Sequence, residues 1–326
     1  MRALKVPGAG VALIRGGRLA WARGWGVRDA GTCEPVTPDT IFQAASISKP
    51  VAALLALRLV EQRRLDLDGD INSHLRRWHL PGDPRFAPDH VTLRQLLNHT
   101  SGVGVSGFHG YPPRTPLPSL AQILDGRSPA NHPAVRLEAK PGAKSSYSGG
   151  GYTIVQAAIE DATGRSFAEL ARREIFTPLG MTHSSFAQPS GRRAGNMASG
   201  HDEGDPFRDR FQVHPELAAA GLWTTPADLA RLMISTWSAT RETGRIVSPD
   251  TAAMMLAPVS NGHRGLGFSL RSKGGERWFG HDGRNWGFQA VAWMNQATGD
   301  GIVIMTNGEG GMALVEEIAK VALPSE

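Results

Sequence analysis

Two residues with complementary chemistry lie three positions apart in the segment 42–50, where Ser46 precedes Lys49. Residues three apart on an α-helix share one face, so the lysine amine can reach the serine hydroxyl. A serine hydroxyl attacks carbonyl groups poorly at neutral pH, and a neighbouring amine can take its proton or stabilise its alkoxide. The unpaired N–H groups of a helix start also favour negative charge there. The spacing therefore indicates the nucleophile of a serine acyl hydrolase.

The S-x-x-K pattern is short, and a serine near a helix N-cap followed by a solvated lysine is the alternative. Two further sites favour catalysis. Tyr147 lies in a glycine-rich segment, and His281-Asp282-Gly283 follows a predicted strand. A buried core tyrosine and a histidine bonded within a sheet are the structural alternatives for these two positions. Three such sites in this order are far more specific than one.

The elements that position these residues can be predicted from periodicity. Strands are expected at both ends of the chain, and short helices broken by Pro and Gly are expected between about residues 68 and 210. This order indicates an α/β lobe with an inserted helical lobe. The active site is expected between the two lobes. The predicted strands are 11–14, 19–22, 276–280, 288–294 and 302–306, and the predicted helices are 46–64, 151–163, 166–176 and 312–321.

Composition excludes several classes of function. The 326 residues are 40% hydrophobic and 20% charged, which is ordinary for a soluble globular protein. The net charge of +5 comes from scattered basic residues, so we expect no nucleic-acid partner. The single cysteine, Cys33, cannot form an intrachain disulfide, and neither H-E-x-x-H nor C-x-x-C occurs. We expect no metal and no cofactor.

The N-terminal residues lack the apolar stretch of a secretory signal, and an uninterrupted apolar segment near 20 residues is absent. The chain as given is therefore expected to be cytoplasmic with no membrane span, or periplasmic or secreted if the native N-terminus is longer. The sequence does not predict the oligomeric state.

With these three sites the chain resembles the serine β-lactamase and penicillin-binding superfamily, in particular its class C β-lactamase, D-alanyl-D-alanine peptidase and family VIII esterase branch. The resemblance spans nearly the whole chain. It implies an α/β (α+β) fold, with a five-stranded antiparallel sheet flanked by helices in residues 1–67 and 211–326 and a helical lobe in residues 68–210. Further familiar stretches are 6–10 (V-P-G-A-G), 96–102 (L-L-N-H-T-S-G), 178–181 (P-L-G-M) and 220–229 (A-G-L-W-T-T-P-A-D-L).

The resemblance also implies roles for individual residues. Ser46 is the expected nucleophile, Lys49 its amine partner, and Tyr147 the tyrosine of Y-x-N and a candidate general base. His281 takes the lysine position of K-T-G, where it is expected to be a weaker cation than lysine. The backbone N–H groups of Ser46 and Arg284 are the expected oxyanion hole.

Departures from the family pattern concern the substrate. Gly149 replaces the asparagine of Y-x-N, which removes an amide that contacts acylamino groups in relatives that process β-lactams, and the glycines after it are expected to loosen the loop. Arg284, following Gly283, offers a permanent charge that is expected to bind a carboxylate. Trp286, three residues past Gly283, is a further candidate for substrate binding.

The leading expectation is therefore a serine hydrolase of small carboxylic esters that works through an acyl-enzyme on Ser46. The alternative among enzymes is a class C-like β-lactamase, or a D-Ala-D-Ala carboxypeptidase or D-aminopeptidase. In each case the expected partner is a small-molecule ester, amide or β-lactam substrate. The alternative of another class is a penicillin-binding sensor that deacylates slowly. His281 does not decide among them, since peptidases and esterases of the superfamily both show such a histidine.

Overall fold

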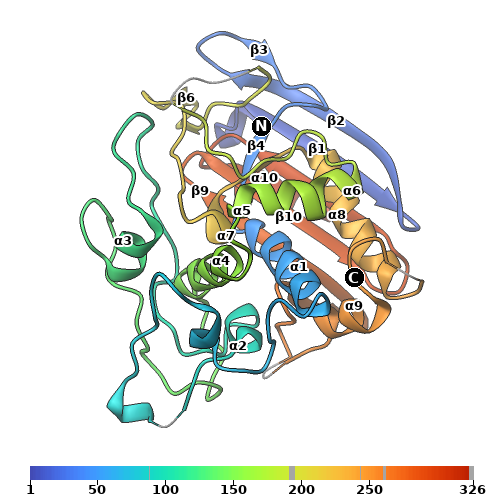
Figure 1. Ribbon diagram of the computed structural model, residues 1–326. Helices are drawn as coiled ribbons and strands as arrows, with labels where there is room; N and C mark the ends of the chain where they lie inside the picture. Colours follow the sequence, from blue (N-terminus) through green and yellow to red (C-terminus); the bar gives the residue numbers. More distant parts are fainter. Residues whose placement is uncertain (88, 191–194, 243, 260–261, 323–326) are drawn as a thin grey trace.

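The computed structural model describes residues 1–326 except 88, 191–194, 243, 260–261 and 323–326. Its centre is an antiparallel sheet in the order β3-β2-β1-β11-β10-β9-β8, in which strands from both ends of the chain lie side by side (Figure 1). The strands of this sheet are β1 (Gly8–Arg15), β2 (Arg18–Asp29), β3 (Glu34–Pro35), β8 (Ser269–Lys273), β9 (Glu276–Asn285), β10 (Phe288–Asn295) and β11 (Gly301–Thr306). Smaller pairs join β4 (Phe42–Ala45) to β7 (Leu222–Thr224) and β5 (His201–Asp202) to β6 (Asp205–Pro206).

The sheet confirms the predicted fold class but has seven strands where five were expected. The two additional strands lie at the edges. β3 has only two residues, and β8 reads S-L-R-S-K, so neither carries the apolar pattern by which strands are recognised. The interior strands β10 and β11 are buried along their whole length, which explains why their apolar runs were visible in the sequence.

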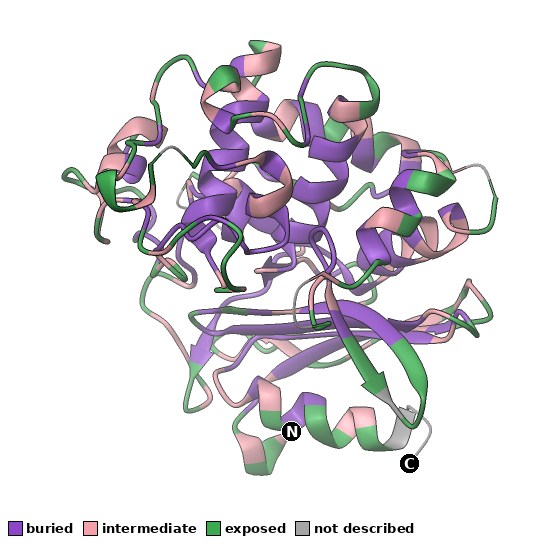
Figure 2. Cartoon of the chain, turned by 90° about the horizontal axis from the view of Figure 1, so that it is seen from below, coloured by how far each residue is buried: buried purple, intermediate pink, exposed green. Residues whose placement is uncertain are grey.

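Helices cover both faces of the sheet. The long α1 and α4 lie side by side in the core, and α10 covers the opposite face (Figures 1 and 2). The helices are α1 (Ser48–Glu61), α2 (Leu93–Leu97), α3 (Leu120–Asp125), α4 (Gly149–Thr163), α5 (Phe167–Ala171), α6 (Thr177–Leu179), α7 (Leu217–Ala220), α8 (Pro226–Ala239), α9 (Pro249–Leu256) and α10 (Gly311–Ala322), with short turns η1 (Arg2–Leu4), η2 (Ile71–His74), η3 (Pro84–Phe86) and the π-helical η4 (Arg172–Phe176). In the described part of the chain, no helix combines the length and the apolar character needed to cross a membrane.

The helix predicted from residue 46 to about residue 64 is shorter at both ends. It begins at Ser48, because Ile47 serves as the N-cap, and it ends at Glu61. Most of α1 is buried, and the helix packs against α4, α5 and α7. A helix that is apolar on nearly every side belongs in a core, so α1 is a rigid support for whatever its N-terminus carries.

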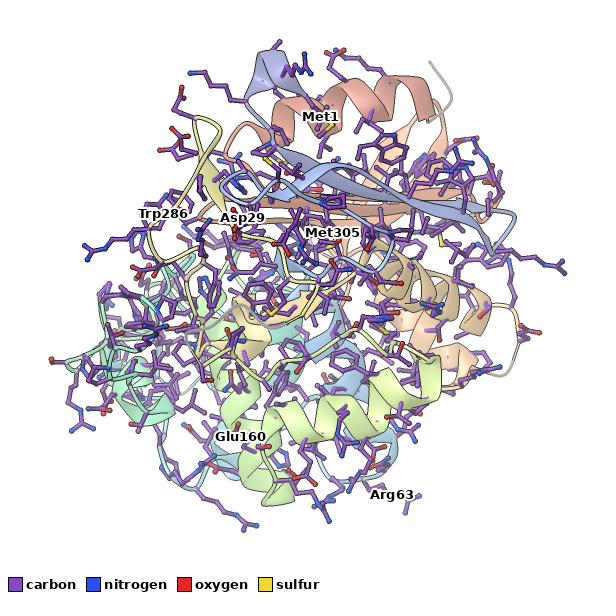
Figure 3. The ribbon with its side chains drawn as sticks, turned by 90° about the horizontal axis from the view of Figure 1, so that it is seen from above. Met1, Asp29, Arg63, Glu160, Trp286 and Met305 are labelled. Carbon is purple, nitrogen blue, oxygen red and sulfur yellow. The ribbon has the colours of Figure 1, made fainter. Side chains whose placement is uncertain are left out.

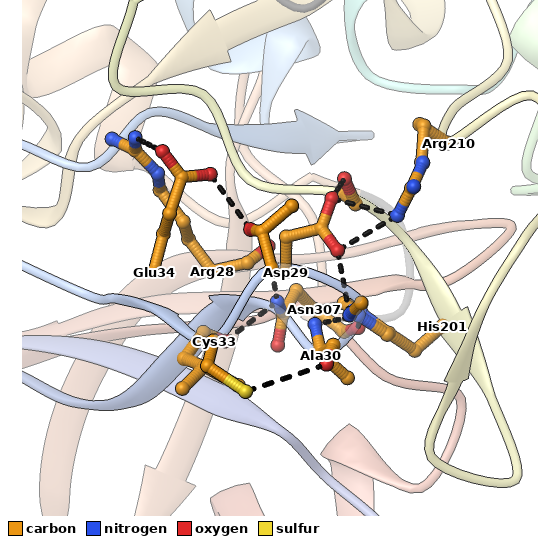
Figure 4. Close-up of polar contacts among 12 residues, drawn as sticks. Arg28, Asp29, Ala30, Cys33, Glu34, His201, Arg210 and Asn307 are labelled. Atoms are coloured by element: carbon orange, nitrogen blue, oxygen red, sulfur yellow. Dashed lines mark hydrogen bonds and ion pairs between the residues drawn. The ribbon is translucent and has the colours of Figure 1, made fainter.

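A buried polar network ties the edge of the sheet to the segment that contains β5 and β6 (Figure 4). The Asp29 carboxylate accepts hydrogen bonds from Arg210 Nη1 and from Ser199 Oγ, each at 2.7 Å. His201 Nε2 accepts the Ala30 amide at 3.0 Å. Charge-assisted bonds of this kind, shielded from water, hold irregular backbone in place. The segment passes beside Trp286, so the network also supports that part of the molecule.

Candidate active site

Ser46 lies in a tight turn between β4 and α1. Ala45, just before it, has a left-handed φ of +49°, a conformation that non-glycine residues adopt rarely. Ser48 stabilises the turn, since its Oγ donates to the Ala45 carbonyl at 2.6 Å and accepts the Leu222 amide at 2.9 Å. The turn leaves Ser46 partly exposed at the start of the helix, while its neighbours on both sides are buried.

Lys49 is almost completely buried, with 2% of its surface exposed, and it points at Ser46. Its Nζ donates to Ser46 Oγ at 3.1 Å and to the Ala219 carbonyl in α7 at 2.8 Å. Burying an amine without partners is costly, and these two hydrogen bonds provide the partners. The structure thus brings the two residues of the S-x-x-K pattern together and orients the lysine with a backbone carbonyl.

Tyr147 lies over the same lysine. The Lys49 Nζ is 4.8 Å from the centre of the tyrosine ring, and the Arg264 Cζ is 5.2 Å from it. The His281 ring centre lies 6.1 Å away. Two cationic side chains therefore face one phenol, an arrangement that favours negative charge on its oxygen during proton transfer.

His99 fixes the backbone on both sides of Tyr147. Its carbonyl accepts the Ser146 amide at 2.8 Å, and its Nδ1 accepts the Ser148 amide at 3.1 Å. Burial, followed by the charge of Lys49, holds the pKa of His99 well below its usual range. The ring is therefore neutral, as its role as an acceptor at Nδ1 requires.

His281 lies inside β9, although the strand was predicted to end before it. Burial, and next the charge of Lys49, lower the pKa of His281 to about 3. The expectation of a weak cation at the lysine position of K-T-G is therefore wrong, because the imidazole is neutral at physiological pH. Its Nδ1 donates to the Asp282 carbonyl at 2.6 Å, which leaves the lone pair on the buried Nε2.

The strand after His281 approaches Ser46 closely. A side chain at Gly283 would place its Cβ 2.1 Å from the Ala44 carbonyl oxygen, so only glycine allows this contact. The pairing of β8 with β9 extends only as far as Gly280. The residues that flank a two-residue hairpin turn exchange both backbone hydrogen bonds, so Asn285 and Gly283 bond to β10. The Arg284 amide therefore points away from β10, to the other edge of β9.

Gly149 and the two glycines that follow form the first turn of α4, not a loosened loop. They are buried, with Ser148 as N-cap. A Cβ at Gly149 would lie 3.0 Å from both the Phe108 ring and the Ser106 carbonyl oxygen. The expectation of a wider loop is wrong, because missing side chains here let backbone and an aromatic ring pack closely.

Arg284 and Trp286 lie at the outer end of the site. The Arg284 side chain is exposed, and its Nε donates to Gln289 Oε1 at 3.0 Å. Trp286 forms the turn between β9 and β10, and Figure 3 shows it at the rim of the molecule. These two residues line a groove together with residues that include Phe108 and Pro112. The groove has a volume of about 560 Å³.

Three residues at the site were not identified as such from the sequence: Arg264, His99 and Ala219. His99 and its neighbours were noted only as a familiar stretch. Arg264 follows Gly262-His263, in a connection without periodicity, and a backbone carbonyl such as that of Ala219 has no sequence signal at all. Among the described residues, no group of three or more His, Cys, Asp or Glu side chains is placed to hold a metal ion.

A serine hydrogen-bonded to a buried lysine at S-x-x-K spacing, between helices and an antiparallel sheet, is typical of one class of serine hydrolases. The chain belongs to the Beta-lactamase family, whose model matches residues 1–324.

The curated relatives carry different activities in their names. The chain is 28% identical to penicillin-binding protein 4 of Amycolatopsis lactamdurans over 353 residues, which cover 98% of this chain and 87% of that protein. It is 29% identical to esterase EstB of Burkholderia gladioli over 225 residues, or 65% of this chain and 56% of the esterase. It spans 43% of the length of protein flp of Staphylococcus aureus (strain MRSA252), at 27% identity over 237 residues.

A solved structure agrees in fold. The octameric penicillin-binding protein homologue from Pyrococcus abyssi superposes with a TM-score of 0.76 at 25% identity, covering 97% of this chain and 75% of that one. Esterase and penicillin-binding names thus occur at similar identity, so the comparisons establish the hydrolase family and leave the substrate open.

Proposed function

We propose that this protein hydrolyses small carboxylic esters through an acyl-enzyme on Ser46. The observation that carries the proposal is the 3.1 Å hydrogen bond between the buried Lys49 amine and the Ser46 hydroxyl, beside Tyr147. A nucleophile within hydrogen-bond reach of a base, with the base oriented by a third group, is the arrangement that covalent catalysis requires. The Ala219 carbonyl is that third group.

The reaction proceeds in two halves. Ser46 Oγ forms a bond to the ester carbonyl carbon while its proton passes to the Lys49–Tyr147 pair, at the Tyr147 oxygen. The step requires this oxygen in its deprotonated form, because Lys49 is already an ammonium group that donates to Ser46 Oγ. The oxyanion faces the amides of Ser46 and Arg284. The carbon–alkoxy bond then breaks, and the leaving oxygen takes up that proton. In the second half, a water loses a proton to the same pair and attacks the acyl-enzyme; Ser46 regains its proton and a carboxylic acid leaves.

Gly149 favours esters over β-lactams. In relatives that process β-lactams, the asparagine at this position supplies an amide to the acylamino group of the substrate, and glycine offers none. The space next to Gly149 is filled by Phe108 and the Ser106 carbonyl. A site without this donor binds a penicillin side chain less well, because the substrate amide is left unpaired on desolvation.

The test uses p-nitrophenyl acetate with the wild-type protein and with Ser46→Ala. The variant is expected to lose turnover by at least about 10³-fold, because the nucleophile is gone. Unchanged turnover in Ser46→Ala would show that Ser46 is not the nucleophile.

A parallel experiment follows the intact mass of the protein mixed with benzylpenicillin and measures the penicillin that remains. The ester proposal predicts neither a lasting adduct nor rapid loss of penicillin. A persistent adduct absent from Ser46→Ala would instead identify a slowly deacylating penicillin-binding protein, and rapid loss with little adduct would identify a β-lactamase.

A further inference from the structure

The groove beside Arg284 is continuous with the oxyanion strand, and its position along β9 decides which half of a substrate it can hold. Tyr147 lies near His281, at the inner end of this strand segment. Trp286 follows five residues later, about 16 Å away at 3.3 Å per residue. The Arg284 amide lies between these two positions. An oxyanion bound at the Arg284 amide therefore has the proton-transfer groups in one direction along β9 and the groove in the other direction.

The leaving oxygen of an ester must receive a proton, so the alcohol half has to lie on the side of Lys49 and Tyr147. The tetrahedral carbon carries four groups: the oxyanion, Ser46 Oγ, the alkoxy group and the rest of the acyl group. Because these groups point apart, the acyl group is directed away from the side that holds the alkoxy group. From the Arg284 amide, the open direction leads to Asn285 and Trp286. The groove is accordingly placed to hold the acyl group.

Two aromatic side chains that line the groove, Trp286 and Phe108, are held in place by packing. Trp286 is 51% exposed, and its ring centre lies 4.1 Å from that of Phe207. Gly287, the second residue of the turn, packs so closely that a Cβ there would lie 2.5 Å from the Phe207 ring. The indole thus offers a large apolar face to solvent without freedom to collapse onto the protein.

Phe108 is held in a similar way. It packs against the backbone of Gly149 and meets the His132 ring edge to face at 4.7 Å between centres. Pro112 also lines the groove. Aromatic side chains lining a groove of about 560 Å³ suit a ligand that carries a flat apolar ring.

The charged residues of the groove have partners that stabilise the hairpin. Glu309 accepts the Gly287 amide and is 3.4 Å from Gln289 Nε2. Arg284 Nε is bound to the oxygen of that same glutamine side chain. These bonds hold the turn that carries Trp286. The groove therefore offers a ligand the aromatic side chains of Trp286 and Phe108 together with polar groups such as His109 and Gln212.

We propose that this groove is the acyl subsite and that it selects esters whose acyl group carries an aromatic ring, such as arylacetyl esters. The proposal rests on the proposed ester hydrolysis and specifies its substrate class. Trp286 and Phe108 are the specificity residues, and Trp286 is the more accessible to test because it lies on a surface turn.

The experiment compares p-nitrophenyl phenylacetate with p-nitrophenyl acetate, which share a leaving group. Each kcat/KM is divided by the rate constant for hydroxide-catalysed hydrolysis of the same ester, so that intrinsic reactivity cancels. The wild type is expected to prefer the phenylacetyl ester by roughly 10-fold. Trp286→Ala is expected to bring this ratio close to unity, whereas Trp286→Phe, which keeps a ring, retains most of it.

Trp25→Ala is the matched control, because Trp25 is the other exposed tryptophan of the described residues, at 42%, and lies on β2. It is expected to leave the ratio unchanged. The acyl subsite is overturned if the wild-type ratio is at or below unity, or if Trp286→Ala leaves the ratio unchanged. In that case Ser46-dependent turnover of the acetate ester still supports the proposed function. Absence of Ser46-dependent turnover of both esters overturns the proposed function and the subsite together.

Discussion

At the scale of single residues, the site differs from the K-T-G pattern in where its positive charge lies. That pattern has a lysine at the position of His281, and here the imidazole is neutral, because burial and Lys49 lower its pKa to about 3. Arg264 lies on the other side of the phenol, with its Cζ 5.2 Å from the Tyr147 ring centre and its Nη1 bound to Ser269 Oγ at 2.9 Å. Arg264 is therefore positioned to supply the charge that the histidine cannot supply.

Arg264→Gln is expected to lower kcat for an ester about 5- to 10-fold with little change in KM, since a charge beside the proton-transfer residue Tyr147 affects the chemical step more than substrate binding. Arg264→Lys should recover part of the loss. The measurement is steady-state kinetics with p-nitrophenyl acetate.

Arg241→Gln is the matched control for this prediction. Arg241 also stacks on an aromatic ring, with its Cζ 4.1 Å from the centre of Trp237, but it is exposed and lies two residues past the end of α8. A loss of the same size in this control would contradict a specific role for Arg264.

At the scale of elements, the turn between β4 and α1 sets the position of the nucleophile. It combines the left-handed Ala45 with the two hydrogen bonds of the Ser48 hydroxyl, which is fully buried. One hydroxyl thus links the turn to β7, the strand that pairs with β4. The turn would otherwise leave a buried carbonyl and a buried amide without partners.

Ser48→Ala is expected to lower the free energy of unfolding by about 1–3 kcal/mol, the cost of leaving those two groups unpaired. Urea denaturation followed by circular dichroism measures it. Ser235→Ala, at a partly exposed position of α8, should change stability by no more than about 0.5 kcal/mol. Equal effects of the two substitutions would show that the Ser48 bonds do not stabilise the turn.

At the scale of the whole molecule, a buried carboxyl group joins the helical segments to the lysine. Glu216 is completely buried, and Tyr111 and His132 face it, the latter with its Nε2 3.7 Å from Glu216 Oε1. Glu216 immediately precedes α7, the helix whose Ala219 carbonyl binds Lys49. Burial raises the pKa of Glu216 from 4.5 to about 7 and lowers that of His132.

This raised pKa makes stability depend on pH. Between about pH 4.5 and pH 7 the folded state holds a proton that the unfolded state has lost, so stability falls as the pH rises through this range. A change in pKa from 4.5 to about 7 corresponds to roughly 3 kcal/mol. Glu216→Gln should remove this loss, so the variant gains stability over the wild type from about pH 5 to about pH 8.

Urea denaturation at several pH values tests this expectation. Glu316→Gln, which changes an exposed glutamate of α10, should follow the wild-type curve in parallel. If the Glu216→Gln curve is parallel to the wild-type curve as well, the buried carboxyl group does not titrate in this range.

Much of this protein follows from local patterns in the chain. The S-x-x-K spacing, the apolar runs of β10 and β11 and the glycine turn of the first hairpin are properties of neighbouring residues, so the sequence determined the fold class and the Ser46–Lys49 pair. It could not determine the state of His281, because a pKa depends on burial and on charges that other segments bring close.

Tertiary structure alone decided the rest of the site. Arg264 faces Tyr147, the Ala219 carbonyl faces Lys49, and Gly283 of β9 packs against the Ala44 carbonyl two residues before Ser46, although each pair is far apart in the chain. Contacts of this kind have no periodicity and no spacing to recognise, since they arise only when packed elements meet. The chemistry of the nucleophile was therefore readable from the chain, and its electrostatic surroundings were decided by the fold.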